Sequence, residues 1–456
     1  MAIKDMVSNQ RDYYNTGSTK NYGFRKEALK KLYEAVLSYE DEIKEALYKD
    51  LNKSGAESYL TEIGVTLKEI KYLIKHLKKF MKRRKRKTEI ANFPAKSFIS
   101  PHPYGVTLIM SPWNYPIYLT LAPLAGAIAA GNTAVVKPSN YSSNTSDIIE
   151  KMLHETFDKE YIGVVKGGRE ENQDLLNQKF DYIFFTGSTT VGKIVMEKAS
   201  KNLTPISLEL GGKSPTIVTK DANIDLSAKR IIFGKLINTG QTCVAPDYVL
   251  IDEDVEEEFI GRCLQYITDF FGKDPLENEN YGKIINKKHF ERLVGLMEDQ
   301  EVVVGGKTDK KKHKIEPTIL RNVSPESAIM QEEIFGPILP ILTYKEINEA
   351  ISFVQARPHP LALYLFTQSR RTIDNVLNQC QFGGGCINDT IMQVASDYLP
   401  FGGVGDSGMG AYHGKASFDT FSHDRSIIKK STLIDVPLRY QPLSDMKMKI
   451  IKKVLK

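Results

Sequence analysis

Short apolar segments alternate with helix-like segments between residues 105 and 209, and this alternation restricts the folds open to the chain. Strands that are apolar on both faces and alternate with helices form parallel sheets, which helices cover on each side. We therefore predict an α/β fold with a doubly wound, parallel-sheet dinucleotide-binding domain. The expected strands are 105–110, 133–137, 161–165, 182–185 and 205–209.

The rest of the chain adds helices in front of this region and a less regular alternation behind it. Residues 24–51 and 61–81 carry apolar residues at helical spacing. After residue 210, helix-like and strand-like segments alternate again, which predicts a second α/β domain. Its expected helices are 224–238, 254–271, 287–299 and 346–355, and its expected strands are 248–251, 338–343 and 362–366.

Composition narrows the class of protein. A chain of 456 residues with 41% hydrophobic and 26% charged residues is typical of a globular protein of two or three domains. Its four cysteines form no Cys-x-x-Cys pair, and no histidine cluster has metal-ligand spacing, so we expect neither a disulfide scaffold nor a metal. The amino terminus lacks an apolar signal segment, and the apolar run 119–130 is short and interrupted by Pro123 and Gly126. These features predict a soluble, cytoplasmic protein.

Two basic segments account for the net charge of +6. Residues 78–87 contain eight basic residues and residues 446–456 contain five, without an acid in either, so the rest of the chain is acidic. No nucleic-acid-binding motif accompanies the first segment, and we interpret it as a solvated helix end and linker. For the basic tail two interpretations stay open: a short amphipathic helix with weak contact to a membrane surface, or a frayed or docked terminus.

Cys243 lies in a turn rich in Gly, Thr and Gln, between a helical pattern and the apolar strand that begins at Tyr248. Such a turn suits a nucleophile, because backbone N–H groups can converge on the thiol. By itself the residue equally fits a small buried hydrophobe. The catalytic interpretation gains weight from Glu209, which precedes Leu-Gly-Gly-Lys-Ser-Pro, and from Asn114, which ends Ser-Pro-Trp-Asn.

These three stretches resemble the aldehyde dehydrogenase superfamily, and Cys-Val-Ala-Pro-Asp-Tyr is most similar to its class 3 branch of fatty and aromatic aldehyde enzymes. The resemblance extends from about residue 10 to about residue 440. It implies a homodimer with a small bridging β element for oligomerisation. The implied division is an NAD(P)-binding domain (1–84 and 106–209), a catalytic domain (210–414), the bridging element (85–105 and 415–440) and a basic tail (441–456).

The glycine-containing turn after strand 182–185 is the expected phosphate-binding site. Gly187, Ser188 and Gly192 stand where a strand passes into a helix, and such a turn lets backbone approach a phosphate. The segment almost matches the phosphate-binding loop of NTPases, but Ile194 provides no hydroxyl for Mg²⁺. The spacing of the two glycines resembles that of aldehyde dehydrogenases.

The resemblance also suggests residues that hold the two ends of the cofactor. It implies that Lys137 binds the adenosine ribose, next to Asn140, where the family commonly has Glu. Because a carboxylate repels a 2′-phosphate and an amide does not, we expect this chain to accept NADP as well as NAD. In the segment 331–337, Glu333 and Phe335 match family residues that hold the nicotinamide half.

The chemistry of aldehyde oxidation gives each candidate a role. The thiolate of Cys243 would attack the carbonyl, and the amide of Asn114 would stabilise the oxyanion together with the Cys243 N–H. After hydride transfer, Glu209 would activate the water that hydrolyses the thioester, with Glu333 as the alternative base. The expected overall reaction is NAD(P)-dependent oxidation of an aldehyde to a carboxylic acid.

The apolar side chains of Tyr115, Ile391 and Phe401 are expected to line the substrate site. Two other functions stay open. One is a CoA-acylating aldehyde dehydrogenase, which would not need Glu209 as a hydrolytic base. The other is a non-catalytic binding or structural protein that keeps the same fold.

Overall fold

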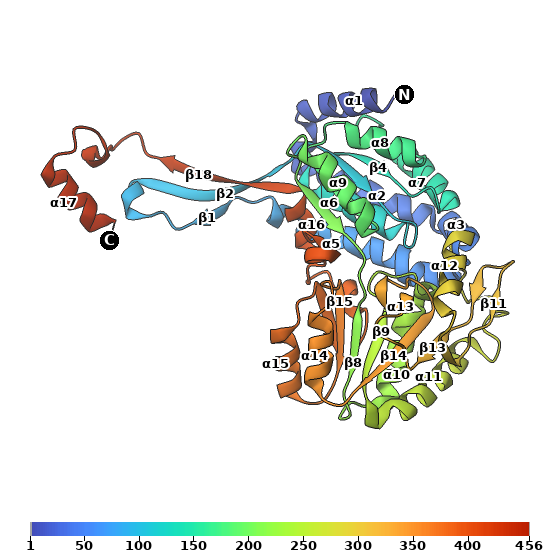
Figure 1. Cartoon of the computed structure of the whole chain (residues 1–456). Coiled ribbons are helices and arrows are strands. Elements are labelled where there is room, and N and C mark those ends of the chain that lie inside the picture. Colours follow the sequence, from blue (N-terminus) through green and yellow to red (C-terminus); the bar gives the residue numbers. More distant parts are fainter. Residues whose placement is uncertain (1, 456) are drawn as a thin grey trace.

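Two mainly parallel sheets organise the chain in the computed structural model, which describes residues 2–455 (Figure 1). The first sheet has six strands in the order β17-β7-β6-β3-β4-β5, and only the edge strand β17 is antiparallel to its neighbour. Its strands are β3 (Val106–Met110), β4 (Thr133–Lys137), β5 (Ile162–Val164), β6 (Tyr182–Thr186), β7 (Ile206–Glu209) and β17 (Gly408–Met409).

The predicted doubly wound arrangement is confirmed in this sheet, because both faces are covered by helices. Along β3, Leu108 and Met110 pack in the cluster that contains residues of α1, α8 and α9, whereas Ile109 packs in the cluster formed with α2, α5, α6 and α7. Alternate residues of a strand point to opposite faces, so both faces must be apolar. These helices are α1 (Ile3–Asn15), α2 (Tyr22–Ser38), α5 (Gly64–Phe80), α6 (Tyr118–Ala130), α7 (Ser143–Thr156), α8 (Arg169–Asn177) and α9 (Thr189–Ser200).

The second sheet has seven strands in the order β10-β13-β14-β9-β8-β15-β16. Its strands are β8 (Pro215–Val218), β9 (Tyr248–Asp252), β10 (Glu301–Val304), β13 (Thr318–Arg321), β14 (Ile338–Tyr344), β15 (Ala362–Phe366) and β16 (Gly384–Ile387). Its helices are α10 (Ile224–Leu236), α11 (Glu256–Phe271), α12 (Lys287–Met297), α13 (Ala328–Gln331), α14 (Ile347–Gln355) and α15 (Arg370–Gln379). A short hairpin, β11 (Thr308–Asp309) and β12 (Lys314–Ile315), lies at the periphery (Figure 1).

A long arm projects from the body and ends in helix α17 (Figure 1). It is a three-stranded sheet in the order β1-β2-β18. Its elements are β1 (Arg84–Arg86), β2 (Ala95–Pro103), β18 (Ser422–Lys430) and α17 (Asp445–Val454). The interpretation of residues 78–87 as a helix end and linker was therefore partly wrong, because the second half of this segment pairs with β2.

Other elements differ from the sequence prediction in their limits. Residues 24–51 form two helices, α2 and α3 (Glu40–Leu51), which meet at Tyr39. A short helix α4 (Gly55–Ser58) and a π-helical turn (Tyr59–Ile63) precede α5, and α16 (Lys415–Thr420) leads into the arm. Among residues 2–455 no helix combines the length and the apolar character needed to cross a membrane.

Candidate functional site

The carboxyl ends of the parallel strands bring the predicted residues to one edge of the first sheet. The register aligns Met110 with Lys137 and with Phe185, and it aligns Thr186 with Glu209. The order of the parallel strands reverses between β3 and β6, and open α/β sheets bind ligands in the crevice at such a switch point. The turns that follow these two strands carry Asn114 and Gly187.

Asn114 connects this edge of the sheet to the cysteine loop. Its side chain is 2% exposed, and its Nδ2 donates a hydrogen bond to the backbone oxygen of Gln241 at 3.0 Å. Its own backbone oxygen accepts a hydrogen bond from Nδ2 of Asn238 at 2.8 Å. An amide nitrogen carries two N–H groups, so one remains as a donor for a substrate oxygen. The sequence prediction missed the roles of Asn238 and Gln241, although both belong to the motif that singled out the cysteine.

Cys243 lies half-buried in the loop between the 3₁₀ turn Ile237–Gly240 and β9. Asn238 and Thr239 adopt left-handed conformations, with φ of 51° and 54°, and strain of this kind is concentrated at functional sites. Both neighbours of the cysteine are held: Thr242 Oγ1 lies 2.5 Å from the Tyr115 hydroxyl, and the Tyr364 hydroxyl donates to the backbone oxygen of Val244 at 2.6 Å.

The surroundings of Cys243 raise the pKa of its thiol and so favour the neutral form over the thiolate. Burial raises the pKa of Cys243, the negative charges of Glu333 and Glu209 raise it further, and nearby backbone N–H groups lower it only in part. A thiol must lose its proton to act as a nucleophile. A base or a bound cationic group is therefore needed to generate the thiolate.

Glu209 is the last residue of β7 and is 2% exposed. Neither of its carboxylate oxygens has a hydrogen-bond partner among residues 2–455. Burial alone raises the pKa of this carboxyl well above its ordinary value. An unpaired buried carboxyl is costly to maintain, and such groups are concentrated where proton transfer takes place.

Glu333 is the second carboxyl near the thiol. Burial, followed by the charge of Asp247, raises its pKa to about 8, although a hydrogen bond from the Gly212 N–H lowers it. A Cβ on Gly211 would lie 1.9 Å from Oε2 of Glu333, so only glycine leaves room for this carboxyl. The two carboxyl groups therefore differ in their contacts: that of Glu209 has no hydrogen-bond partner within residues 2–455, whereas that of Glu333 accepts a hydrogen bond from the Gly212 backbone.

Lys137 and Asn140 both approach the turn at Gly167 and Gly168, which follows β5. The buried ammonium of Lys137 donates to the backbone oxygens of Pro138 at 2.9 Å and Gly167 at 2.8 Å, and burial lowers its pKa to about 8. Asn140 is exposed, and its Nδ2 lies 3.6 Å from where a Cβ on Gly168 would stand. A cation and an amide at the end of β4 suit the hydroxyl groups of an adenosine ribose.

The glycine-containing turn is the N-terminus of α9. The Ser188 hydroxyl caps the helix by accepting a hydrogen bond from the Val191 N–H at 3.4 Å. Gly187 donates its N–H to the backbone oxygen of Glu209 at 3.0 Å. A Cβ on Gly192 would lie 2.6 Å from the Leu210 side chain, so this glycine lets α9 pack closely against the chain that follows β7. The remaining N–H groups of the first turn suit a phosphate.

A cavity of about 580 Å³ joins this turn to the Glu333 segment. Its lining includes Thr189 from α9, Gly211 and Gly212 after β7, and Glu333 before β14. The predicted phosphate-binding turn and the predicted nicotinamide-binding segment thus border one space. The residues present fit a nicotinamide dinucleotide.

Phe335 belongs to an aromatic row beside this space. It adopts a left-handed conformation with φ of 51°, and its ring meets that of Trp113 edge-on at 5.3 Å. The other side of Trp113 lies 5.3 Å from the ring of His289 on α12. Arg292 of the same helix donates to the backbone oxygens of Glu333 and Ile334 at 3.2 and 2.5 Å. Nothing in the sequence singled out these two α12 residues.

The predicted substrate-lining residues come from distant parts of the chain. Tyr115 and Ile391 pack against the large apolar cluster that contains Phe401, as Cys243 also does. Ile391 has φ of 56°, and the ring of Phe401 stacks on His413 at 5.4 Å. Apolar side chains of this kind would suit an apolar substrate.

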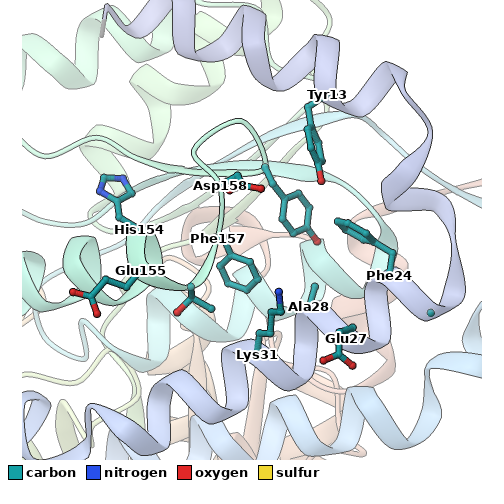
Figure 2. A pocket seen from close by; sticks show the side chains of 12 residues that line it. Tyr13, Phe24, Glu27, Ala28, Lys31, His154, Glu155, Phe157 and Asp158 are labelled. Atoms are coloured by element: carbon teal, nitrogen blue, oxygen red, sulfur yellow. The ribbon is translucent and has the colours of Figure 1, made fainter.

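A further cavity, of about 460 Å³, is lined by residues of α1, α2 and the segment from α7 to Tyr161, just before the edge strand β5 (Figure 2). Phe24 of α2, Tyr13 of α1 and Phe157 after α7 contribute aromatic walls, and Glu27 and Asp158 lie at its rim. It borders β5, at the end of the sheet remote from β7, and is separate from the candidate site. In the part of the chain that the structure describes, no group of His, Cys, Asp and Glu is arranged to hold a metal ion.

Comparison with known proteins identifies the family. The model of the aldehyde dehydrogenase family matches residues 2–427. The 4,4'-diaponeurosporen-aldehyde dehydrogenase of Staphylococcus aureus is 50% identical, over 100% of this chain and 99% of its own length. Aldehyde dehydrogenase family 3 member A2 of Rattus norvegicus is 44% identical, over 98% of this chain and 92% of its own.

Solved structures agree with this identification. A structure described as the substrate-bound state of Staphylococcus aureus AldH superposes with a TM-score of 0.98 at 50% identity, and it covers 100% of both chains. The resemblance found in the sequence, including that to the class 3 branch, is therefore confirmed. The chain belongs to the aldehyde dehydrogenase family.

Proposed function

We propose that this aldehyde dehydrogenase oxidises its substrate to the carboxylic acid through a thioester on Cys243, with NAD or NADP as hydride acceptor. The observation that carries the proposal is that two polar groups of the first sheet act on the loop that holds Cys243. The side chain of Asn114 is hydrogen-bonded to the backbone oxygen of Gln241, two residues before the cysteine, and the charge of Glu209 raises the pKa of the thiol. These are the donor and the base that the reaction requires.

The first step forms a bond between Cys243 and the substrate. After the thiol gives its proton to a nearby carboxylate, Glu209 or Glu333, which passes it on to solvent, Sγ attacks the carbonyl carbon, and the π electrons move to the oxygen. The free N–H of the Asn114 amide and the backbone N–H of Cys243 donate to this oxyanion. The nicotinamide, when bound, accepts the hydride from the same carbon, and this oxidation leaves a thioester on the cysteine.

The second step releases the acid. Glu209 accepts a proton from water, and the water oxygen attacks the thioester carbon. The C–S bond breaks, the carboxylic acid leaves, and Glu209 passes the proton that it took from water to the Cys243 thiolate. The raised pKa of Glu209 makes its ionised form a stronger base than an exposed carboxylate. Glu333 is the alternative base, since its pKa is also raised and its charge also acts on the thiol.

The cofactor is proposed to lie between the ends of β4 and β7. Lys137 and Asn140 would bind the adenosine ribose, and Gly187, Ser188 and the first turn of α9 would border the diphosphate. Glu333 and Phe335 would hold the nicotinamide half. Because Asn140 brings no negative charge to the ribose, we expect NADP to be accepted as well as NAD.

The substrate is proposed to be an apolar aldehyde. Tyr115, Ile391 and Phe401 support this through their position against the apolar cluster next to Cys243. The 50% identical relative is named for 4,4'-diaponeurosporen-aldehyde, so a test should include long apolar aldehydes beside short and aromatic ones.

We propose a homodimer formed through the arm. A sheet that projects from the body with exposed Ile427 and Ile428 needs another surface to cover it (Figure 1).

Exposed Met446 and Ile450 on α17, among its lysines, also suit a weak contact with an anionic membrane surface. Light scattering of the full chain and flotation with anionic vesicles test the two proposals, and the cytoplasmic location stays a prediction.

The test of the reaction is NAD(P)H formation with a panel of aldehydes, with and without CoA, for the wild type and Cys243→Ala. Cofactor reduction that needs no CoA and disappears in the variant supports the hydrolytic mechanism. Turnover only with CoA would replace it by the acylating reaction. Cofactor binding without turnover in either condition would instead indicate a non-catalytic protein.

A further inference from the structure

A buried ion pair lies directly behind the candidate oxyanion donor. Nζ of Lys53 and Oε1 of Glu62 are 2.6 Å apart, and their side chains are 1% and 0% exposed. Removing two charges from water costs free energy that their attraction often fails to recover. A pair at this depth therefore calls for a reason other than stability.

The ammonium of Lys53 contacts two adjacent residues of the active-site turn. Nζ donates to the backbone oxygen of Asn114 at 3.3 Å and lies 4.3 Å from the centre of the Tyr115 ring. Both residues in turn contact the cysteine loop: the Asn114 side chain donates to the backbone oxygen of Gln241, and the Tyr115 hydroxyl is hydrogen-bonded to that of Thr242. One buried cation thus contacts the backbone of one residue and the ring of the next, and the side chains of both residues contact the segment before the nucleophile.

Glu62 fixes the other end of the same turn. Its Oε2 accepts the N–H groups of Ile117 and Tyr118, at 2.8 and 3.4 Å. These groups start α6 and have no partner within the helix, so the carboxylate caps it. Lys53, which precedes α4, and Glu62, in the turn before α5, together fasten residues 114–118 at both ends.

We propose that Lys53, held by Glu62, is a positioning residue that aims the Asn114 amide at the substrate oxygen. This inference rests on the proposed function, because it requires Asn114 to be the oxyanion donor. Removal of the ammonium takes away one of the two hydrogen bonds to the Asn114 carbonyl and leaves only that from Asn238 Nδ2, so its peptide group is held from one side and gains freedom to tilt. The proposal requires the effect on the rate to pass through Asn114 and not through the contact of Lys53 with Tyr115.

A double-mutant cycle tests this dependence. Lys53→Met is expected to lower kcat by about 10- to 100-fold, below the loss of about 10²–10³ that follows removal of an oxyanion donor. KM should change by less than about threefold, because the interaction is made in the transition state. In the Asn114→Ala background the same substitution should change kcat by less than about twofold.

Lys314→Met is the matched control. This lysine is 6% exposed and donates to the backbone oxygens of Leu276 and Asn278 at 3.2 and 2.9 Å, but it lies in the peripheral β11–β12 hairpin. The control should lower thermal stability and leave kcat unchanged. Lys53→Met/Glu62→Gln removes both charges of the pair and serves if the single variant does not fold.

The outcomes separate this inference from the proposed function. Equal loss of kcat from Lys53→Met in the wild-type and Asn114→Ala backgrounds overturns the positioning role and leaves Asn114 as the donor. An Asn114→Ala variant with full activity overturns the proposed donor itself, and this inference with it. A loss in Lys314→Met as large as in Lys53→Met also overturns the inference, because general destabilisation then explains both.

Discussion

Replacement of Glu209 by Gln separates the two chemical steps of the proposed reaction. The amide has nearly the same shape as the carboxyl, but it cannot accept a proton from water. Within residues 2–455 neither carboxylate oxygen has a partner to lose, so the fold should tolerate the change. The thiol and the Asn114 donor stay in place, so bond formation and hydride transfer should continue.

The expected size of the effect follows from the role. Loss of a general base slows proton transfer by about 10²–10⁴-fold, which corresponds to about 3–5 kcal/mol in the activation free energy. The loss should fall on hydrolysis of the thioester alone. The melting temperature should change little, because a buried acid with a raised pKa is replaced by a neutral group.

Rapid-mixing measurement of NAD(P)H absorbance is the assay. Glu209→Gln should give a burst close to one equivalent per active site, followed by a steady state slowed by the factor above. Glu333→Gln is the comparison variant. Loss of the burst in Glu209→Gln would refute its assignment to hydrolysis, and an unchanged steady state would transfer the base role to Glu333.

Three further predictions follow from single contacts. Burial raises the pKa of Glu69 in the folded protein to about 7. The protonated carboxyl stabilises the folded state fully below the pKa of the unfolded chain, about 4.5, and this stabilisation is lost as the pH rises through 7. Glu69→Gln should therefore reduce the fall in unfolding free energy between pH 5 and 8 by about 3 kcal/mol, measured by urea unfolding; an unchanged fall would contradict this. Asn140→Glu should weaken binding of NADP but not of NAD, as measured by cofactor titration, and equal effects would show that residue 140 does not face the 2′ position. Gly211→Ala should displace the Glu333 carboxyl and cost about 1–3 kcal/mol, and a thermal shift within error would show that this turn can move aside.

Local pattern was sufficient to predict the first sheet. The strands from β3 to β7 are short and mostly apolar, because both faces of the sheet are covered, and such segments can be recognised without knowledge of the fold. In the second sheet β8, β10, β13 and β16 were not predicted. β8 begins with Pro215, and β16 contains glycines where a Cβ on Gly385 would lie 2.0 Å from the backbone of β15. Their strand character comes from their neighbours.

The sequence by itself determined the fold class, the family and the short list of chemical groups: Cys243, Glu209, Asn114 and the glycine-containing turn. Only the tertiary structure decided how these groups are held. The hydrogen bond from Asn114 to Gln241 joins residues that are 127 positions apart in the sequence, and the hydrogen bond from Lys53 to Asn114 joins residues that are 61 positions apart. A buried polar group must find a partner wherever the fold supplies one. Contacts of this kind leave no periodicity or spacing in the chain, whereas burial of strands and helices does.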